Sequence, residues 1–151
     1  MGKNIILGLA LMLGGLASLT SANAAPGNKT ITRLYGPDMV RLLEGEGFHG
    51  AKVDNDGDVT VKMDGYLVSF YVIGEGKEMH IRLTVPKGEA TLQRVNNWNK
   101  KIPYTRAHMD ENAVMLEMAL DVSKGVTEAT VAEYMTYFMH KVRPFVKTVC
   151  E

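Results

Sequence analysis

Four histidines are the first candidates for chemistry in this sequence: His49, His80, His108 and His140. No two are four residues apart, and none belongs to a His-Glu-x-x-His motif, which presents two zinc ligands on one helix face. His80 and His108 fall in predicted strands and would share a face if those strands lay close together. With a carboxylate within reach, either could serve a hydrolase. The sequence contains neither a Gly-x-Ser-x-Gly nor a Walker A motif, so we expect structural or exposed histidines.

An acidic cluster, Asp-Asn-Asp-Gly-Asp at 54–58, places three carboxylates at alternate positions. Calcium loops of EF-hands alternate oxygen ligands in the same way, because calcium takes six to eight of them. Here, however, glycine comes fourth rather than sixth, and the twelfth residue is Gly65 instead of glutamate. We therefore expect a polar turn between two short strands and no bound metal.

The single cysteine, Cys150, excludes an internal disulfide and a multi-thiolate zinc site. A nucleophilic cysteine needs a rigid scaffold and a partner base, whereas residues near a chain end are usually mobile. We expect a free thiol. A disulfide between two chains, and with it a homodimer, stays open.

The amino-terminal segment predicts export. Lys3 precedes an uncharged apolar stretch at 5–19, and Ala-Asn-Ala follows at 22–24, which is the pattern of a secretory signal peptide. The stretch is shorter than the roughly 20 residues that a membrane span needs. We expect cleavage after Ala24 and a periplasmic or secreted product. The predicted domains are a signal peptide at 1–24, a flexible lead at 25–33 and a single domain at 34–151.

The amino-acid composition disfavours several classes of binding partner. The 17 basic and 17 acidic residues balance, which argues against nucleic-acid binding. No later stretch is apolar enough to span a membrane. Export argues against cytosolic cofactors such as ATP or NAD, and we expect no cofactor.

The elements that must position these residues follow from hydrophobic periodicity. Two strands flank Asp64-Gly65, a favoured type I′ hairpin turn, and their pattern pairs Met63 with Tyr66. A later hairpin that pairs Met109 with Val114 would set Arg106 opposite Glu117. The full set of predicted elements is a helix near 37–45, strands at 59–63, 66–73 and 79–85, a helix at 89–100, strands near 104–109 and 114–121, and a helix capped by Thr127 and disturbed by Pro144.

Strands joined by short turns, with helices between them, indicate the α+β class. We expect a twisted antiparallel sheet with helices packed mainly on one face.

From Leu92 onward, the sequence resembles the YbjN family of bacterial proteins, which are described as sensory transduction regulators. The resemblance rests on Val-Asn-Asn-Trp-Asn at 95–99, Arg106-Ala107, Asp-Glu-Asn at 110–112, Leu116-Glu117, Leu120-Asp121 and Gly-Val-Thr at 125–127. It implies a fold like that of type III secretion chaperones. It supplies no catalytic residues.

Four residues of these motifs are candidate binding residues: Trp98, Asn99, Arg106 and Glu117. Each also has a structural interpretation, since Trp98 could fill the core, Asn99 could satisfy backbone groups and Arg106 could pair with Glu117. We expect a non-enzymatic, chaperone-like or regulatory module that binds a protein or peptide outside the cytoplasm. The alternatives are a small-molecule sensor in the cell envelope and, less favoured, a small periplasmic hydrolase.

Overall fold

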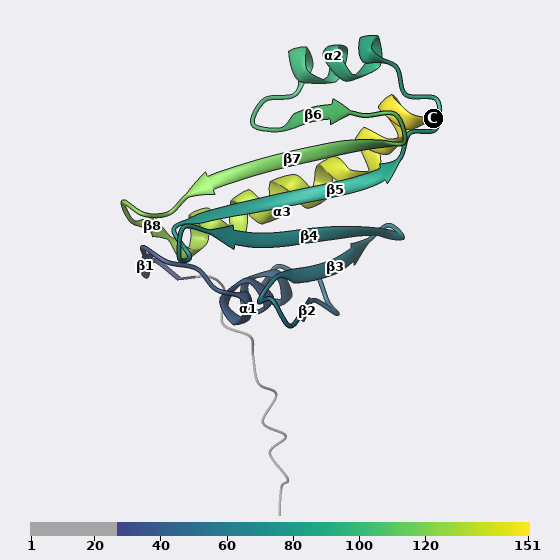
Figure 1. The fold of residues 1–151 in the computed structure, drawn as a ribbon. Coiled ribbons are helices and arrows are strands. Elements are labelled where there is room, and N and C mark those ends of the chain that lie inside the picture. Colours follow the sequence, from purple (N-terminus) through teal and green to yellow (C-terminus); the bar gives the residue numbers. More distant parts are fainter. Residues whose placement is uncertain (1–26) are drawn as a thin grey trace, which may run out of the picture.

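The structure, a computed structural model, describes residues 27–151, so the expected signal peptide at 1–24 lies outside the described residues. Groups of strands are separated by helices along the chain (Figure 1). In order they are β1 (Thr30–Ile31), α1 (Gly36–Gly45), β2 (Lys52–Val53), β3 (Val59–Met63), β4 (Tyr66–Ile73), β5 (Glu78–Pro86), α2 (Leu92–Lys101), β6 (Arg106–Met109), β7 (Ala113–Asp121), β8 (Val126–Thr127), α3 (Glu128–Phe145) and a π-helical turn, η1 (Val146–Cys150).

The first hairpin confirms the predicted register. Met63 pairs with Tyr66 across the turn, and the rest of β3 follows in step along β4. Asp64 and Gly65 have φ angles of +50° and +88°, which is the left-handed conformation that a type I′ turn requires at both central positions.

Six strands form one antiparallel sheet in the order β2-β3-β4-β5-β7-β6. β5 and β7 are neighbours although α2 and β6 separate them in the sequence, and β6 folds back to the outer edge of β7. The second hairpin confirms the predicted pairs, with Arg106 opposite Glu117 and Met109 opposite Val114. Part of the segment 25–33 forms β1, which pairs with β8 outside the main sheet.

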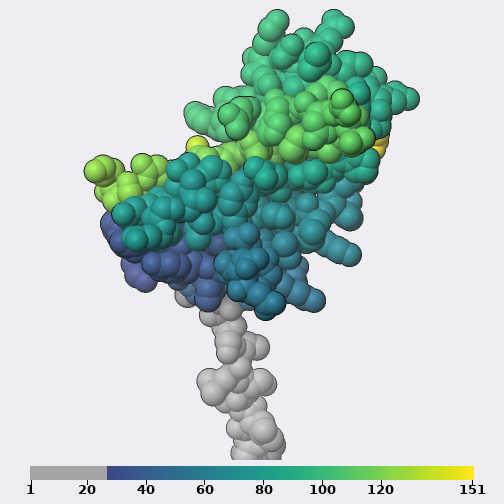
Figure 2. All heavy atoms as spheres, viewed as in Figure 1, coloured from purple at the N-terminus to yellow at the C-terminus, as the bar shows by residue number. Residues whose placement is uncertain are grey.

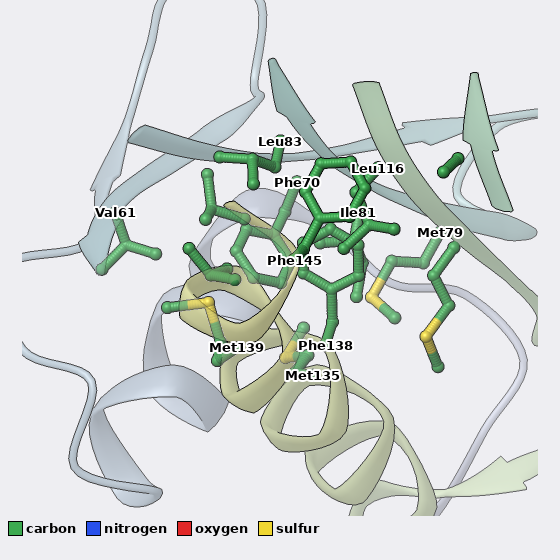
Figure 3. Close-up of a cluster of buried hydrophobic side chains, with 14 of the residues drawn as sticks. Val61, Phe70, Met79, Ile81, Leu83, Leu116, Met135, Phe138, Met139 and Phe145 are labelled. Atoms are coloured by element: carbon green, nitrogen blue, oxygen red, sulfur yellow. The ribbon is translucent and has the colours of Figure 1, made fainter. Parts of the chain in front are cut away.

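The core lies between one face of the sheet and α3. Side chains from both sides interlock there (Figure 3), and alternate residues of the strands supply the sheet's share because successive side chains point to opposite faces. The largest fully buried side chains include Phe70, Ile81, Leu83, Leu116, Met135, Phe138 and Phe145. α1 packs on the same side through Met39, Leu42 and Leu43, which confirms helices mainly on one face. Within residues 27–151, no helix is long and apolar enough to cross a membrane.

Two boundaries differ from the prediction. The helix expected from residue 89 begins at Leu92, because the Thr91 hydroxyl accepts a hydrogen bond from the Arg94 amide and caps it there. The strand expected from residue 104 begins at Arg106, because Tyr104 has a φ of +66° and leaves the extended conformation.

The expected free thiol is confirmed, but Cys150 is not mobile as its place near the chain end suggested. Its side chain is buried in the core, and its carbonyl accepts a hydrogen bond of 2.9 Å from the Glu89 amide. Burial raises the pKa of the thiol, which disfavours the reactive thiolate. This burial disfavours a disulfide between two folded chains through Cys150.

The acidic segment 54–58 forms the expected turn, between β2 and β3. One oxygen of Asp54 accepts hydrogen bonds from the amides of Asp56 and Asp58, both at 3.0 Å. Partial burial, followed by the charges of Asp54 and Asp56, raises the pKa of Asp58. No group of three or more histidine, cysteine or acidic side chains in residues 27–151 is arranged to hold a metal ion.

Candidate binding face of the sheet

The face of the sheet turned away from α3 carries no helix in the described part of the chain. Figure 2 looks onto this side, where the teal and green atoms of the strands hide most of α3. We call it the open face. It presents the residues that alternate with the core positions, among them two exposed aliphatic side chains, Leu67 and Ile73, which are 52% and 45% exposed.

Glu117, in the middle of β7, is the centre of a charged cluster on the open face. Arg82 on β5 lies directly opposite it on one side, and Arg106 on β6 lies directly opposite on the other. The Arg82 Nε and Nη2 atoms lie 2.7 and 2.6 Å from Glu117 Oε1, and Arg106 Nη2 lies 2.9 Å from Oε2. One carboxylate thus contacts two guanidinium groups, from the strands on either side of β7.

The environment of Glu117 favours its charged form. Partial burial by itself would raise the pKa of this carboxyl group, but the hydrogen bonds from Arg106 and Arg82 outweigh burial, so the net pKa is lowered. The glutamate carries one negative charge and the arginines two positive ones, and Glu78, which lines the same depression as Arg106, offsets the remaining positive charge.

Aromatic rings extend the cluster towards β4. The Tyr71 ring stacks on His80 with a centroid separation of 5.2 Å, and the Arg82 guanidinium lies 5.3 Å from the Tyr71 centroid. His80 Nε2 is 2.9 Å from an oxygen of Glu78. His108 Nδ1 is buried without a hydrogen-bond partner, 3.6 Å from Glu117.

These residues line a shallow depression of about 550 Å³ that runs from Tyr71 and Ile73 to Arg106. A second depression of about 310 Å³, which shares Arg106 and includes Tyr104, continues it. Two histidines therefore lie near acids, as a hydrolase would need. Within residues 27–151, however, no hydroxyl or thiol group is hydrogen bonded to either histidine. The arrangement suits recognition better than nucleophilic catalysis.

The structure separates the four candidate residues into two pairs. Arg106 and Glu117 meet on the open face. Trp98 lies inside, 4% exposed, where its indole N–H donates to the Thr105 hydroxyl at 3.1 Å. Asn99 hydrogen bonds to the backbone of Ala107, accepting from its N–H at 2.8 Å and donating to its carbonyl at 2.9 Å.

Sequence reasoning missed Tyr71 and Arg82, and it considered His80 only as a hydrolase candidate or as a structural or exposed residue. The alternation within β4 and β5 already placed these side chains on the polar side of their strands. The missing information was the position of β7 beside β5, which brings Glu117 to Arg82.

The arrangement of the sheet and helices is the fold of solved type III secretion chaperones. The chaperone SycH of Yersinia pestis, in complex with a fragment of YscM2, matches with a TM-score of 0.53 and 18% identity, over 76% of this chain and 99% of SycH. The ExsC–ExsE complex matches with a TM-score of 0.55 and 14% identity, over 76% and 93%.

The chain belongs to the YbjN family. The family profile, described as "Putative bacterial sensory transduction regulator", matches residues 39–151. YbjN of E. coli has a similar structure, with a TM-score of 0.63 and 12% identity, over 78% of this chain and 92% of that one. A search of curated proteins finds no match.

Proposed function

We propose that this protein is a non-enzymatic regulatory or chaperone-like module that binds a protein or peptide segment on the open face of its sheet, outside the cytoplasm. The observation that carries the proposal is the open face itself, where a cluster of paired arginine and glutamate side chains lies beside exposed aliphatic side chains. A module of this kind needs a partner to cover such a surface.

The chemistry of the open face suits a protein partner. Tyrosine and arginine are enriched at protein interfaces, and they supply many of the residues that dominate binding energy. Glu117 fixes Arg82 and Arg106 in place, so less conformational entropy is lost when a partner binds. Each guanidinium has five N–H donors, and those not used by Glu117 remain for carboxylate or carbonyl groups of the partner.

The related folds support the same function. SycH and ExsC were each solved in complex with another protein. The proposal of an extracytoplasmic location rests on the leader pattern at 1–24. Cell fractionation tests it: the protein should lie outside the cytoplasm with its first residue at Ala25, and a cytoplasmic chain that retains 1–24 would contradict it.

Site-specific photocrosslinking in cells tests the binding face. A photoreactive phenylalanine at Ile73, on the open face, should crosslink a defined partner. The control position is Leu92 on α2, which is 68% exposed and lies away from the open face. A photoreactive phenylalanine at Leu92 should give no defined crosslinked product. Purified partner should then bind the wild type and lose affinity for Arg106→Ala, whereas Arg143→Ala on α3 should bind normally. Equal crosslinking at Ile73 and Leu92 would contradict the proposal.

A further inference from the structure

A further cavity lies between α2 and the carboxyl-terminal part of α3, and none of its lining residues lines the depressions of the open face. Its volume is about 270 Å³. This is slightly below the range of roughly 300–1,000 Å³ in which drug-sized molecules bind. A cavity of this size admits a small organic molecule and excludes a folded partner. We call it the interhelical cleft.

The walls of the cleft are mainly apolar. They include Trp98 and Ile102 from the α2 end and Pro144 from α3. The single N–H of the Trp98 ring already donates to Thr105, so the ring offers only carbon surface to the cleft. This lining suits the hydrocarbon or aromatic part of a ligand.

The lining also contains two lysines, Lys101 on α2 and Lys141 on α3, together with Asn97 and Thr148. No carboxylate lines the cleft, and neither lysine forms an ion pair among the described residues, where Lys29 is the lysine that does. Lys141 Nζ lies 4.6 Å from the centroid of the Tyr137 ring, which holds the ammonium group at the cleft. Two cations beside an apolar wall are complementary to a ligand with one anionic end.

Contacts among α2, α3 and the segment after α2 support the walls of the cleft. The Tyr137 hydroxyl donates to the Pro103 carbonyl at 2.9 Å and ties α3 to the segment that follows α2. The Trp98 ring packs edge-on against Phe145 at 5.1 Å between centroids. Directly after Pro144, the helix widens into the π-helical turn η1, a rare conformation that is found often at functional sites.

From this geometry we propose that the interhelical cleft binds a small amphipathic carboxylate, with its apolar body against Trp98 and its carboxylate between Lys101 and Lys141. The ligand class goes beyond the protein-binding function of the open face. The cleft and the open face share no lining residue, so each can be tested without the other.

Calorimetric titration of the purified protein with octanoate tests the proposal, with octanol as the neutral probe of similar size. Octanoate should bind saturably and octanol much more weakly. Because Trp98 is the only tryptophan, its fluorescence should change along the same binding curve. Absence of saturable octanoate binding, or equal binding of octanol, would overturn the proposal.

Charge-removal variants locate the site. Lys101→Gln and Lys141→Gln should each weaken octanoate binding about fivefold, as expected for the loss of one exposed ion pair of up to about 1 kcal/mol. Lys100→Gln is the matched control, because Lys100 is the adjacent lysine and does not line the cleft. Thr148→Phe should fill the cleft and abolish binding. Equal weakening by Lys100→Gln and Lys101→Gln would overturn the assignment.

Discussion

Replacement of Glu117 by glutamine should destabilise the protein measurably at neutral pH. The Glu117 side chain is 13% exposed and accepts one hydrogen bond from Arg82 Nε and one from Arg106 Nη2, while Arg82 Nη2 makes an ion-pair contact of 2.6 Å with the same oxygen as Nε. Exposed ion pairs contribute about 0.2–1 kcal/mol each. The Arg82–Glu117 pair should contribute at the upper end of this energy range, because two nitrogens of Arg82 contact one oxygen of Glu117. The Arg106–Glu117 pair should contribute at the lower end, because the Arg106 side chain is 77% exposed. The expected loss in unfolding free energy is therefore about 1–1.5 kcal/mol.

The stability lost in Glu117→Gln should become smaller as the pH falls. Because the folded-state pKa of Glu117 is lowered, its contribution is fully present above the unfolded-state pKa of about 4.3. It disappears as the pH falls through the folded-state value, since both states are then protonated. Asp110, Asp121 and Glu128 also have lowered pKa values. These three groups contribute equally to the stability of the wild type and of Glu117→Gln. The difference in unfolding free energy between the two proteins therefore reports the contribution of Glu117 alone.

Urea unfolding followed by Trp98 fluorescence measures this difference at a series of pH values. The deficit of Glu117→Gln should be largest at neutral pH and should shrink steadily below the unfolded-state pKa. Glu111→Gln, in the exposed turn between β6 and β7, is the control and should match wild type at every pH. A deficit that stays constant on acidification would refute the assignment of the stabilisation to the ionised carboxylate.

Three further predictions concern the contacts around the core. Asn99→Ala should lower stability by about 1–3 kcal/mol, because it leaves the backbone of Ala107 unpaired, and it should speed hydrogen exchange at that amide, whereas Asn96→Ala should do neither. Thr127→Ala should cost about 1 kcal/mol in thermal unfolding because it removes the α3 cap, and serine at this position should restore most of the loss. The Cys150 thiol should react with an aromatic disulfide reagent only after denaturation; rapid reaction of the folded protein would contradict its burial.

The sequence allowed the local parts of the fold to be predicted. The register around Asp64-Gly65 followed from one turn type and one alternating pattern, which agreed with each other. The pairing of Arg106 with Glu117 followed in the same way, since only a short turn separates their strands. Both contacts depend on interactions within about a dozen residues.

The remaining features depend on tertiary structure that no local pattern contains. Arg82 reaches Glu117 because β7 inserts between β5 and β6, and the connection between β5 and β7 includes a whole helix. Cys150 was predicted to be mobile from its position in the chain, yet its burial follows from packing against the segment around Glu89. The interhelical cleft likewise depends on the distance between α2 and α3.

The burial of Phe145 and Val149 near the end of the chain constrains the order of folding. Both are fully buried, and β3, β4 and β5 are synthesised about 60 to 90 residues earlier. During translation, the apolar face of β3, β4 and β5 must therefore leave the ribosome before the helix that covers it. The nascent chain can close its core only after residue 150 has emerged, and until then it presents a hydrophobic surface that molecular chaperones of the cell would recognise.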